Sequence, residues 1–253
     1  MRLKLIACKV LTREISRALA NSANYIDTTF IRRDYHDRPE VLRRVLQDEI
    51  DKIDENDDIY THRFQDASQD FDAILLGYGL CSNALLGLVS KKYPLVVPKA
   101  HDCVTLFLGS KERYDKEFHS KNGIYWYTKG WIENSLMPSK HSYEIAYHKF
   151  VDLYGEDNAE FLLEMEQGWN TKYENCIFIS QGMPGEEQDR TFTKECAHFM
   201  NWKYGELKGD HTLMDDFING NWQEDRFLVV PPGKTICASF DHDIVCVGER
   251  QTD

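Results

Sequence analysis

The sequence is short of positive charge. Lysine and arginine together number 30 of the 253 residues, against 42 aspartates and glutamates, so the formal net charge at pH 7 is -12. Proteins that hold nucleic acid do so through basic patches, and anionic membrane surfaces attract the same kind of charge. We therefore expect no nucleic-acid partner and no membrane partner.

Long apolar runs are also lacking. The longest uncharged apolar stretches, 73–80 and 85–90, are well below the roughly 18 residues that indicate a membrane-spanning helix. The opening MRLKLIAC has neither the apolar stretch nor the cleavage site of a secretory signal. The seven cysteines are odd in number and widely spaced, unlike those of a disulfide-stapled domain. These absences predict a cytoplasmic protein with reduced thiols.

The first part of the chain alternates strand and helix patterns. Apolar runs typical of buried strands lie at 3–10, 25–31, 71–79 and 94–98, and amphipathic helical spacing occurs at 11–20 and 39–53. This order is typical of a parallel sheet with helices on both faces. The fold class that we expect is α/β, with mainly parallel sheets flanked by helices.

Beyond residue 110 the composition turns aromatic, and α/β patterning then returns. Helical patterns lie at 140–154, 158–169, 191–202 and 211–218, strand patterns lie at 176–179 and 227–230, and 236–247 indicates an edge strand or hairpin. No low-complexity linker separates the two parts. We expect two Rossmann-like halves, 1–110 with the functional site and 111–253 rich in aromatic residues, with a cleft between them.

Three thiols and one imidazole follow predicted strands. Cys8 closes the first strand, Cys81 follows the third, and His101 and Cys103 follow the fourth. Because the carboxyl ends of parallel strands meet at one edge of a sheet, we expect these side chains to converge. Thiolates and imidazoles hold Zn²⁺ or iron–sulfur clusters. The sequence therefore predicts a metal site of Cys8, Cys81, His101 and Cys103, with zinc as the expected metal and an iron–sulfur cluster as the alternative.

Small and polar residues surround Cys81. Gly77 and Gly79 allow the backbone to approach closely, and with Ser82 and Asn83 they are the predicted cofactor-binding residues.

Two residues of the Ala100–Cys103 stretch are candidates for catalysis. His101 is either the fourth metal ligand or a general acid/base, and Asp102 is a candidate to orient its imidazole. Buried cysteines also serve as small core residues, and the spacing is not a local motif such as C-x-x-C. The structural and the metal-binding interpretations of these cysteines both stay open at this point.

The other four cysteines, at 176, 196, 237 and 246, lie in strand, helix or tail patterns where core packing explains them. Nucleotide motifs are weak. No Gly-x-Gly-x-x-Gly follows the first strand, and PPGKT at 231–235 lacks the first glycine of a phosphate loop. The sequence therefore does not favour a nucleotide-binding enzyme.

Several segments resemble a known family. They are LIACKVL at 5–11, LGYGLCSN at 76–83, VPKAHDC at 97–103, LFLGS at 106–110, and YW with GW at 125–131. Together they resemble the domain-of-unknown-function family 1638 of bacteria and archaea. Some members are encoded near corrinoid-dependent methyltransferases, so the resemblance implies a link to methyl-group or corrinoid metabolism. It implies a corrinoid as a further cofactor and a corrinoid protein or methyltransferase as partner, but it assigns no ligand residues.

Two functions remain open. The first is a metal-dependent enzyme, a transferase of methyl groups or other small molecules, with its metal at the cysteine site and a small-molecule substrate. The second is a non-catalytic accessory or maturation protein that binds a corrinoid, a metal or a methyltransferase partner. In the second case the aromatic segment 125–131 is a docking or ring-stacking surface, whereas its plain interpretation is a core between domains.

Overall fold

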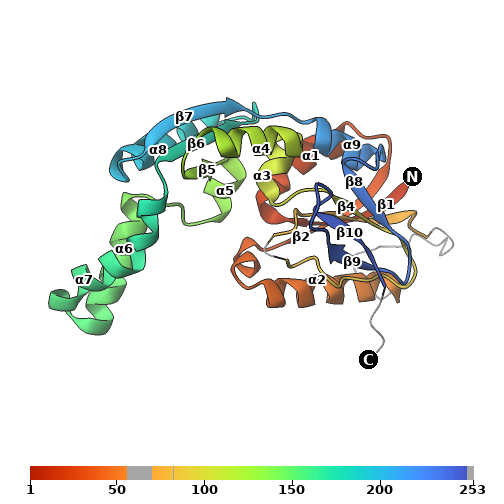
Figure 1. The fold of residues 1–253 in the computed structure, drawn as a ribbon, viewed down its shortest axis with the longest axis horizontal. Coiled ribbons are helices and arrows are strands. Elements are labelled where there is room, and N and C mark those ends of the chain that lie inside the picture. The colour runs from red at the N-terminus through yellow and green to blue at the C-terminus, as the bar shows by residue number, and fades with distance from the viewer. Residues whose placement is uncertain (56–69, 82, 250–253) are drawn as a thin grey trace. The chain divides into compact units, whose positions relative to one another are not determined.

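The computed structural model describes residues 1–55, 70–81 and 83–249 (Figure 1). Its contacts divide the chain into two compact units. Unit 1 comprises Met1–Tyr114 and Asp210–Asp253, and unit 2 comprises Asp115–Gly209. Ser82, one of the predicted cofactor-binding residues, lies outside the described residues.

Unit 1 is built on a five-stranded sheet. The strands are β1 (Arg2–Cys8), β2 (Tyr25–Ile31), β3 (Ala73–Gly77), β4 (Leu95–Pro98) and β8 (Phe227–Val230). Their order is β2-β1-β3-β4-β8, in which the first four are parallel and β8 runs antiparallel to β4. Strands β1, β3 and β4 are almost entirely buried, as expected for a sheet covered on both faces. The predicted α/β class is confirmed.

Helices cover both faces of this sheet. They are α1 (Thr12–Ala20), α2 (Pro39–Asp54), α3 (Cys103–Leu108) and α9 (Thr212–Asn219), with the short 3₁₀ helices η1 (Lys9–Leu11) and η2 (Arg33–Asp37) and with α4 (Lys111–Ser120) after α3. Figure 1 shows α1, α3 and α9 on one face and α2 on the other. Helix α2 buries Leu42, Leu46, Ile50 and Ile53, whose spacing of three or four residues places them on one side of a helix.

The path of the chain creates a switch point between β1 and β3. From β1 the chain crosses through α1 to β2 on one side, and it then crosses through α2 to β3 on the other side of β1. Right-handed crossovers in opposite directions place the two helices on opposite faces and let the loops after β1 and β3 diverge. Open α/β sheets bind ligands in the crevice at such a point. The residues that follow β1 and β3 are therefore candidates for a functional site.

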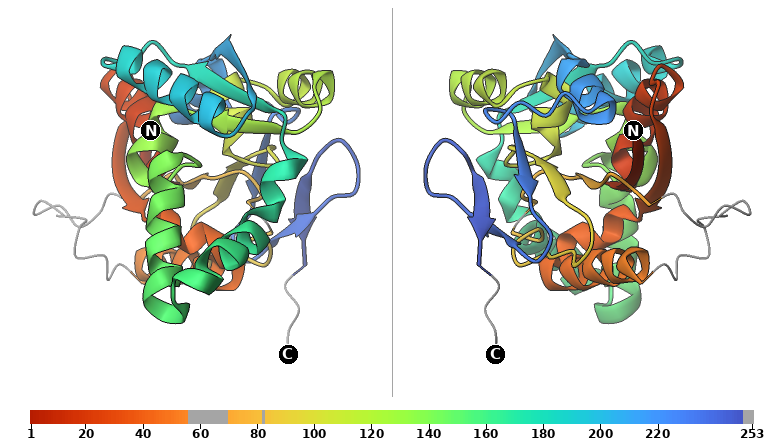
Figure 2. Two further views of the ribbon diagram at one scale, coloured as in Figure 1. Left: turned by 90° about the vertical axis from the view of Figure 1, so that its left-hand side faces the viewer. Right: turned by 90° about the vertical axis from the view of Figure 1, so that its right-hand side faces the viewer.

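A small hairpin completes unit 1. Strands β9 (Thr235–Ala238) and β10 (Val245–Gly248) form a separate antiparallel ribbon (Figure 2), one of the two arrangements that the tail pattern indicates. Backbone hydrogen bonds join Ile236 to Gly87 and Leu88. The hairpin is thereby fixed to the loop between β3 and β4.

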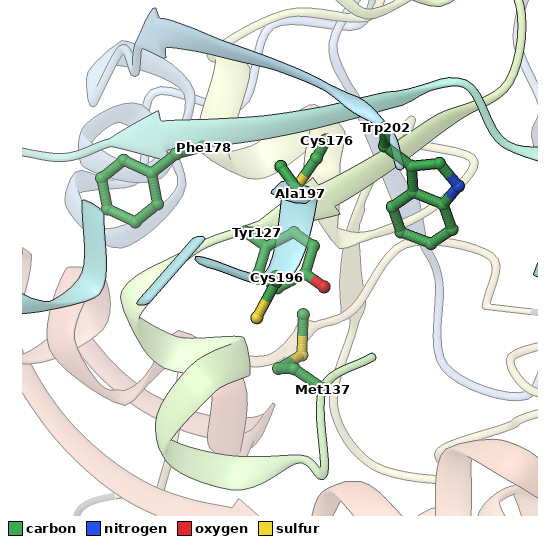
Figure 3. Packing of buried hydrophobic residues seen from close by; sticks show 7 residues of the cluster. All are labelled: Tyr127, Met137, Cys176, Phe178, Cys196, Ala197 and Trp202. Carbon is green, nitrogen blue, oxygen red and sulfur yellow. The ribbon is translucent and has the colours of Figure 1, made fainter. Parts of the chain in front are cut away.

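Unit 2 is a smaller α/β unit. Its parallel sheet has the order β5 (Ile124–Tyr127), β6 (Asn175–Ser180), β7 (Lys203–Lys208). The helices are α5 (Lys129–Asn134), α6 (Lys140–Tyr154), α7 (Glu156–Gln167) and α8 (Glu186–Phe199), with η3 (Gly168–Lys172) after α7. Figure 3 shows its core, in which Cys176, Cys196 and Trp202 pack with Tyr127, Met137, Phe178 and Ala197. The strand order is sequential, so this sheet has no switch point.

The two units differ from the expected halves 1–110 and 111–253 in one respect. Residues 210–253 belong with unit 1, because β8 pairs along β4 from Leu95 to Pro98. Without β8, strand β4 would be a sheet edge with unpaired backbone groups.

In the described residues no helix combines the length and the apolar character needed to cross a membrane.

Candidate functional site

Cys8 is the last residue of β1 and lies at the switch point. Only 6% of the residue is exposed. Burial raises the pKa of its thiol because a thiolate loses its hydration there, and the nearby Arg33 guanidinium offsets part of that rise. The thiol is therefore neutral at pH 7, and it stands beside a cationic side chain.

The turn after β3 places Cys81 beside the loop that follows β4. The backbone N–H of Leu80 donates to Ala100 O at 2.7 Å, and that of Cys81 donates to His101 O at 3.1 Å. The loops cross at Gly79, where a Cβ atom would lie 2.6 Å from the Cα of Asp102. A side chain at position 79 would therefore push the loops apart. Cys81 itself has a φ of 47°, a left-handed conformation that costs a non-glycine residue energy.

Tyr78, Cys8 and Cys81 are all buried at the switch point. Burial raises the pKa of Cys81, and negative charge on Cys8 and on Asp102 would raise it further. Burial and the same two thiols raise the pKa of Tyr78. Among the described residues the Tyr78 hydroxyl has no hydrogen-bond partner, although only 1% of that residue is exposed. A buried hydroxyl without a partner is rare, because leaving it unpaired costs stability.

Asp102 is the N-cap residue of α3 and lies on the loop that crosses Gly79. Its carboxylate caps the helix by accepting from the Val104 N–H at 2.9 Å, and the Tyr114 hydroxyl donates to it at 3.0 Å. Burial raises the pKa of Asp102, and these two bonds oppose the rise. The sequence-based interpretation paired Asp102 with the imidazole of His101. In the structure the oxygens of Asp102 accept from Val104 and Tyr114, charge on His101 also lowers the pKa of Asp102, and the exposed His101 ring lies 6.5 Å, centroid to centroid, from the Tyr114 ring.

The turn after β2 brings a guanidinium and an imidazole near the switch point. Arg33 and His36 belong to η2, which directly follows β2. Burial and the neighbouring Arg33 lower the pKa of His36, while Asp37 and Asp102 oppose this shift. Sequence reasoning missed both residues and also Tyr78. The argument that took candidate residues from the carboxyl ends of the other strands applies equally to residues 32–36 (RRDYH), which follow β2.

Cys81 is therefore near enough to Cys8 and Asp102 for their charges to raise the pKa of its thiol, and the charges of both thiols act on Tyr78. Cys103 is 5% exposed as the first residue of α3. In the described ranges 1–55, 70–81 and 83–249, no three His, Cys, Asp or Glu side chains are grouped so that they could hold a metal ion.

Gly77 and Asn83, two of the predicted cofactor-binding residues, have roles in packing and in the turn after β3. At Gly77 a Cβ would lie 2.6 Å from the Ala7 Cβ, so this glycine lets β3 pack against β1. Asn83 has a φ of 68° and is exposed, and its carbonyl accepts from the Arg43 guanidinium at 2.7 Å. Both residues shape the turn around Cys81.

A second pair of thiols occurs in the core of unit 2. Cys176 and Cys196 adjoin Tyr127 (Figure 3), and burial raises the pKa of both thiols, that of Cys196 to about 11. The Tyr127 hydroxyl donates to Pro138 O at 2.6 Å, and Cys176 Sγ donates to Thr193 O at 3.6 Å. These polar groups have partners within the protein. This pair provides a structural reference for the pair in unit 1. All seven cysteines are free thiols.

The aromatic segment expected as a docking surface or a core is largely core of unit 2. Tyr127 is fully buried, and Tyr125 stacks on Trp202 with ring centroids 5.6 Å apart and contacts Tyr173 and Trp169. These rings pack against residues of their own unit, so the segment 125–127 is part of a core.

Fold and site together define an α/β protein with a Rossmann-like unit whose switch point holds two buried thiols and an unpartnered tyrosine hydroxyl. The family described as a protein of unknown function (DUF1638) matches residues 30–218, and the chain belongs to that family. The match includes Cys81, His101 and Cys103, whereas Cys8 precedes it. Neither the search of curated proteins nor the search of solved structures returned a match.

Proposed function

We propose that the chain is a metal-binding protein whose site lies at the switch point of unit 1, and that it acts as an enzyme on a small molecule. Cys8 and Cys81 supply two thiolates, and His101 and Cys103 complete the site when metal binds. Zinc is the proposed metal, and an iron–sulfur cluster is the alternative. The observation that carries the proposal is the pair of buried thiols beside the unpartnered Tyr78 hydroxyl at the ligand-binding end of the sheet.

The donor set fits a soft cation. If both thiols lost their protons, the two thiolates would repel each other, which helps to keep their pKa values raised, and a cation bound between them would remove that repulsion. The described conformation does not assemble a third ligand, so binding requires the 100–103 loop to supply it. His101 is exposed and Cys103 opens α3, so both lie on the loop that crosses Gly79.

Zinc in such a site supplies a Lewis acid that activates a bound sulfur or oxygen nucleophile. Other residues near the switch point would position the substrate. Arg33, which also pairs with Asp37 at 2.6 Å, adds positive charge near Cys8 that would attract an anionic group, and Tyr78 offers a hydroxyl as hydrogen-bond donor. Asp102, fixed by Val104 and Tyr114, anchors the loop that carries His101. A role in methyl transfer, with a corrinoid protein or methyltransferase as partner, is the specific form of the proposal, and a cytoplasmic location would keep the thiols reduced.

The test is metal analysis of the untagged protein purified without air. About one zinc per chain without colour supports the zinc form, and iron with sulfide and a brown absorption spectrum supports the cluster form. Cys8→Ser and Cys81→Ser are each expected to lose most of the metal while their circular dichroism spectra stay unchanged. Absence of metal after reconstitution with zinc and with iron and sulfide would reject the metal site.

Cys196→Ser is the matched control. It removes a buried thiol that also adjoins another thiol and a tyrosine, but in the core of unit 2. We expect it to retain the metal of the unchanged protein. If Cys196→Ser lost as much metal as Cys81→Ser, the cysteines of unit 1 would not be the specific metal ligands.

A second candidate is the non-catalytic accessory protein. It is favoured by the exposed apolar side chains of Phe161 and Met165 in unit 2, which are 64% and 69% exposed. An accessory protein would pass its metal or corrinoid to a partner, whereas an enzyme retains metal during turnover. Incubating the zinc-loaded protein with a corrinoid methyltransferase and a methyl donor, followed by metal analysis of both separated proteins, distinguishes them.

A further inference from the structure

Helices α6 and α7 form a hairpin in unit 2 and contact each other at an angle (Figures 1 and 2). Gly155, with a φ of 81°, makes the turn between them. Helix α6 contains no buried residue over its 15 residues, and α7 buries only Ala159 and Leu163. Most of the surface of this hairpin is therefore exposed in the described chain.

Helix α7 carries apolar side chains on two opposite sides. Ala159 and Leu163 lie four residues apart on the buried side. Phe161 and Met165 also lie four residues apart, but two positions along a helix turn a side chain by about 200°. They accordingly face away from the buried side, and 64% and 69% of these residues is exposed. A surface helix normally has one apolar face, so the second one is a candidate contact surface.

Negative charge lies along one side of the outward pair. Helix α7 contains five carboxylates and no lysine or arginine: Glu156, Asp157, Glu160, Glu164 and Glu166. Helical phase places Asp157 and Glu164 beside Phe161 and Met165. Within the described residues none of these five carboxylates makes an ion pair. We call Asp157, Phe161, Glu164 and Met165 the α7 outer face.

We propose that the α7 outer face binds a basic amphipathic helix of another protein. Phenylalanine and the flexible methionine fill a groove or cover an apolar stripe, and the carboxylates pair with lysine or arginine beside that stripe. A second copy of this chain fits poorly, because two acidic faces would meet and repel each other. The charge around the apolar pair thus selects a basic partner. This inference does not depend on the proposed metal site.

The test uses the full chain and a fluorescently labelled 18-residue peptide of leucine and lysine, arranged so that its helix has one apolar and one basic face. Fluorescence anisotropy measures the affinity. We expect Phe161→Ser/Met165→Ser to weaken binding at least tenfold, and Asp157→Asn/Glu164→Gln to weaken it mainly at low salt. Raising sodium chloride should weaken binding to the unchanged protein.

Two matched controls separate this face from the general acidity of the chain. Phe240→Ser removes a fully exposed phenylalanine of unit 1, and Glu112→Gln/Glu224→Gln removes two exposed carboxylates outside the α7 outer face. We expect both to bind the peptide as the unchanged protein does. Equal binding by Phe161→Ser/Met165→Ser would overturn the proposal. Light scattering is run in parallel, and a dimer that this variant dissociates would identify a second copy as the occupant and overturn it as well.

Discussion

Two buried tyrosines show how a single hydroxyl distinguishes a site from a core. Tyr78 and Tyr127 each adjoin two buried cysteines, and burial raises the pKa of both phenols. The Tyr127 hydroxyl donates to Pro138 O, whereas the Tyr78 hydroxyl has no hydrogen-bond partner among the described residues. Water or a ligand group must satisfy a buried hydroxyl if its cost is to be avoided. This difference sets the thiols of unit 1 apart from those of unit 2.

We predict that Tyr78→Phe leaves the stability of the metal-free protein unchanged or raises it by up to about 1 kcal/mol, because the substitution removes an unpaired buried hydroxyl. Tyr127→Phe should lower stability by about 0.5–1.5 kcal/mol, since it removes a formed hydrogen bond. Urea unfolding followed by circular dichroism measures both. Similar losses in the two variants would show that the Tyr78 hydroxyl is paired.

Gly79 governs the position of Cys81 relative to Asp102. We predict that Gly79→Ala destabilises the protein by about 1–3 kcal/mol, because the new Cβ would lie 2.6 Å from the Asp102 backbone. Gly168→Ala is the control: its Cβ meets nothing within 4 Å and its φ is -56°. Thermal unfolding of both variants is the measurement. A Gly79→Ala variant as stable as Gly168→Ala would mean that the two loops do not cross closely.

At the scale of elements, the spacing of apolar residues predicted the helices and strands that have a clear local pattern. The strands 25–31 and 227–230 have the bounds expected from sequence, and α6 matches 140–154. Strands β5 and β7 were missed. The KYGELK sequence of β7 is polar and contains a glycine, because β7 is an edge strand of its sheet. The pattern at 191–202 missed the start of α8 at Glu186, which follows the left-handed Gly185.

The site was predictable only as far as strand ends. The alternation of strands and helices predicted that Cys8, Cys81, His101 and Cys103 converge at one edge of a sheet, and the convergence of all four stays a prediction. In the structure, burial raises the pKa of Cys81, and charge on Cys8 and on Asp102 raises it further. Which loop residues turn toward each other depends on tertiary contacts, such as the crossing at Gly79 and the left-handed φ of Cys81. Those contacts join segments some 20 residues apart, so no local pattern encodes them. For the same reason, the sequence could not show that Asp102 bonds Tyr114.

Helix α2 packs its buried face within unit 1, so that face should contribute strongly to stability. We predict that Leu46→Ala lowers the free energy of unfolding by about 2–5 kcal/mol, because Leu46 is fully buried and its loss leaves a cavity. Asp48→Ala, at an exposed position of the same helix, should change stability by less than about 0.5 kcal/mol. Denaturant unfolding checks both. A small effect of Leu46→Ala would contradict the close packing of α2 on the sheet.

At the scale of the whole molecule, the buried thiols couple stability to pH. Burial raises the pKa of Cys8, Cys81, Cys176 and Cys196 above their ordinary value of 9.0. Above that value the unfolded chain has lost these protons while the folded chain still holds them. The unfolded state then binds fewer protons, so the free energy of unfolding decreases as pH rises.

We therefore predict that the metal-free protein loses stability progressively from about pH 9 to about pH 11, measured by urea unfolding under anaerobic reducing conditions. Cys176→Ala should reduce this slope, because the variant has one buried thiol fewer. Between about pH 6 and about pH 8 the metal-bound protein should show the opposite sign. There the bound thiols are thiolates that must be reprotonated on metal loss, so added zinc should stabilise the protein more as pH rises. A zinc effect independent of pH would argue against Cys8 and Cys81 as ligands, even if zinc binds.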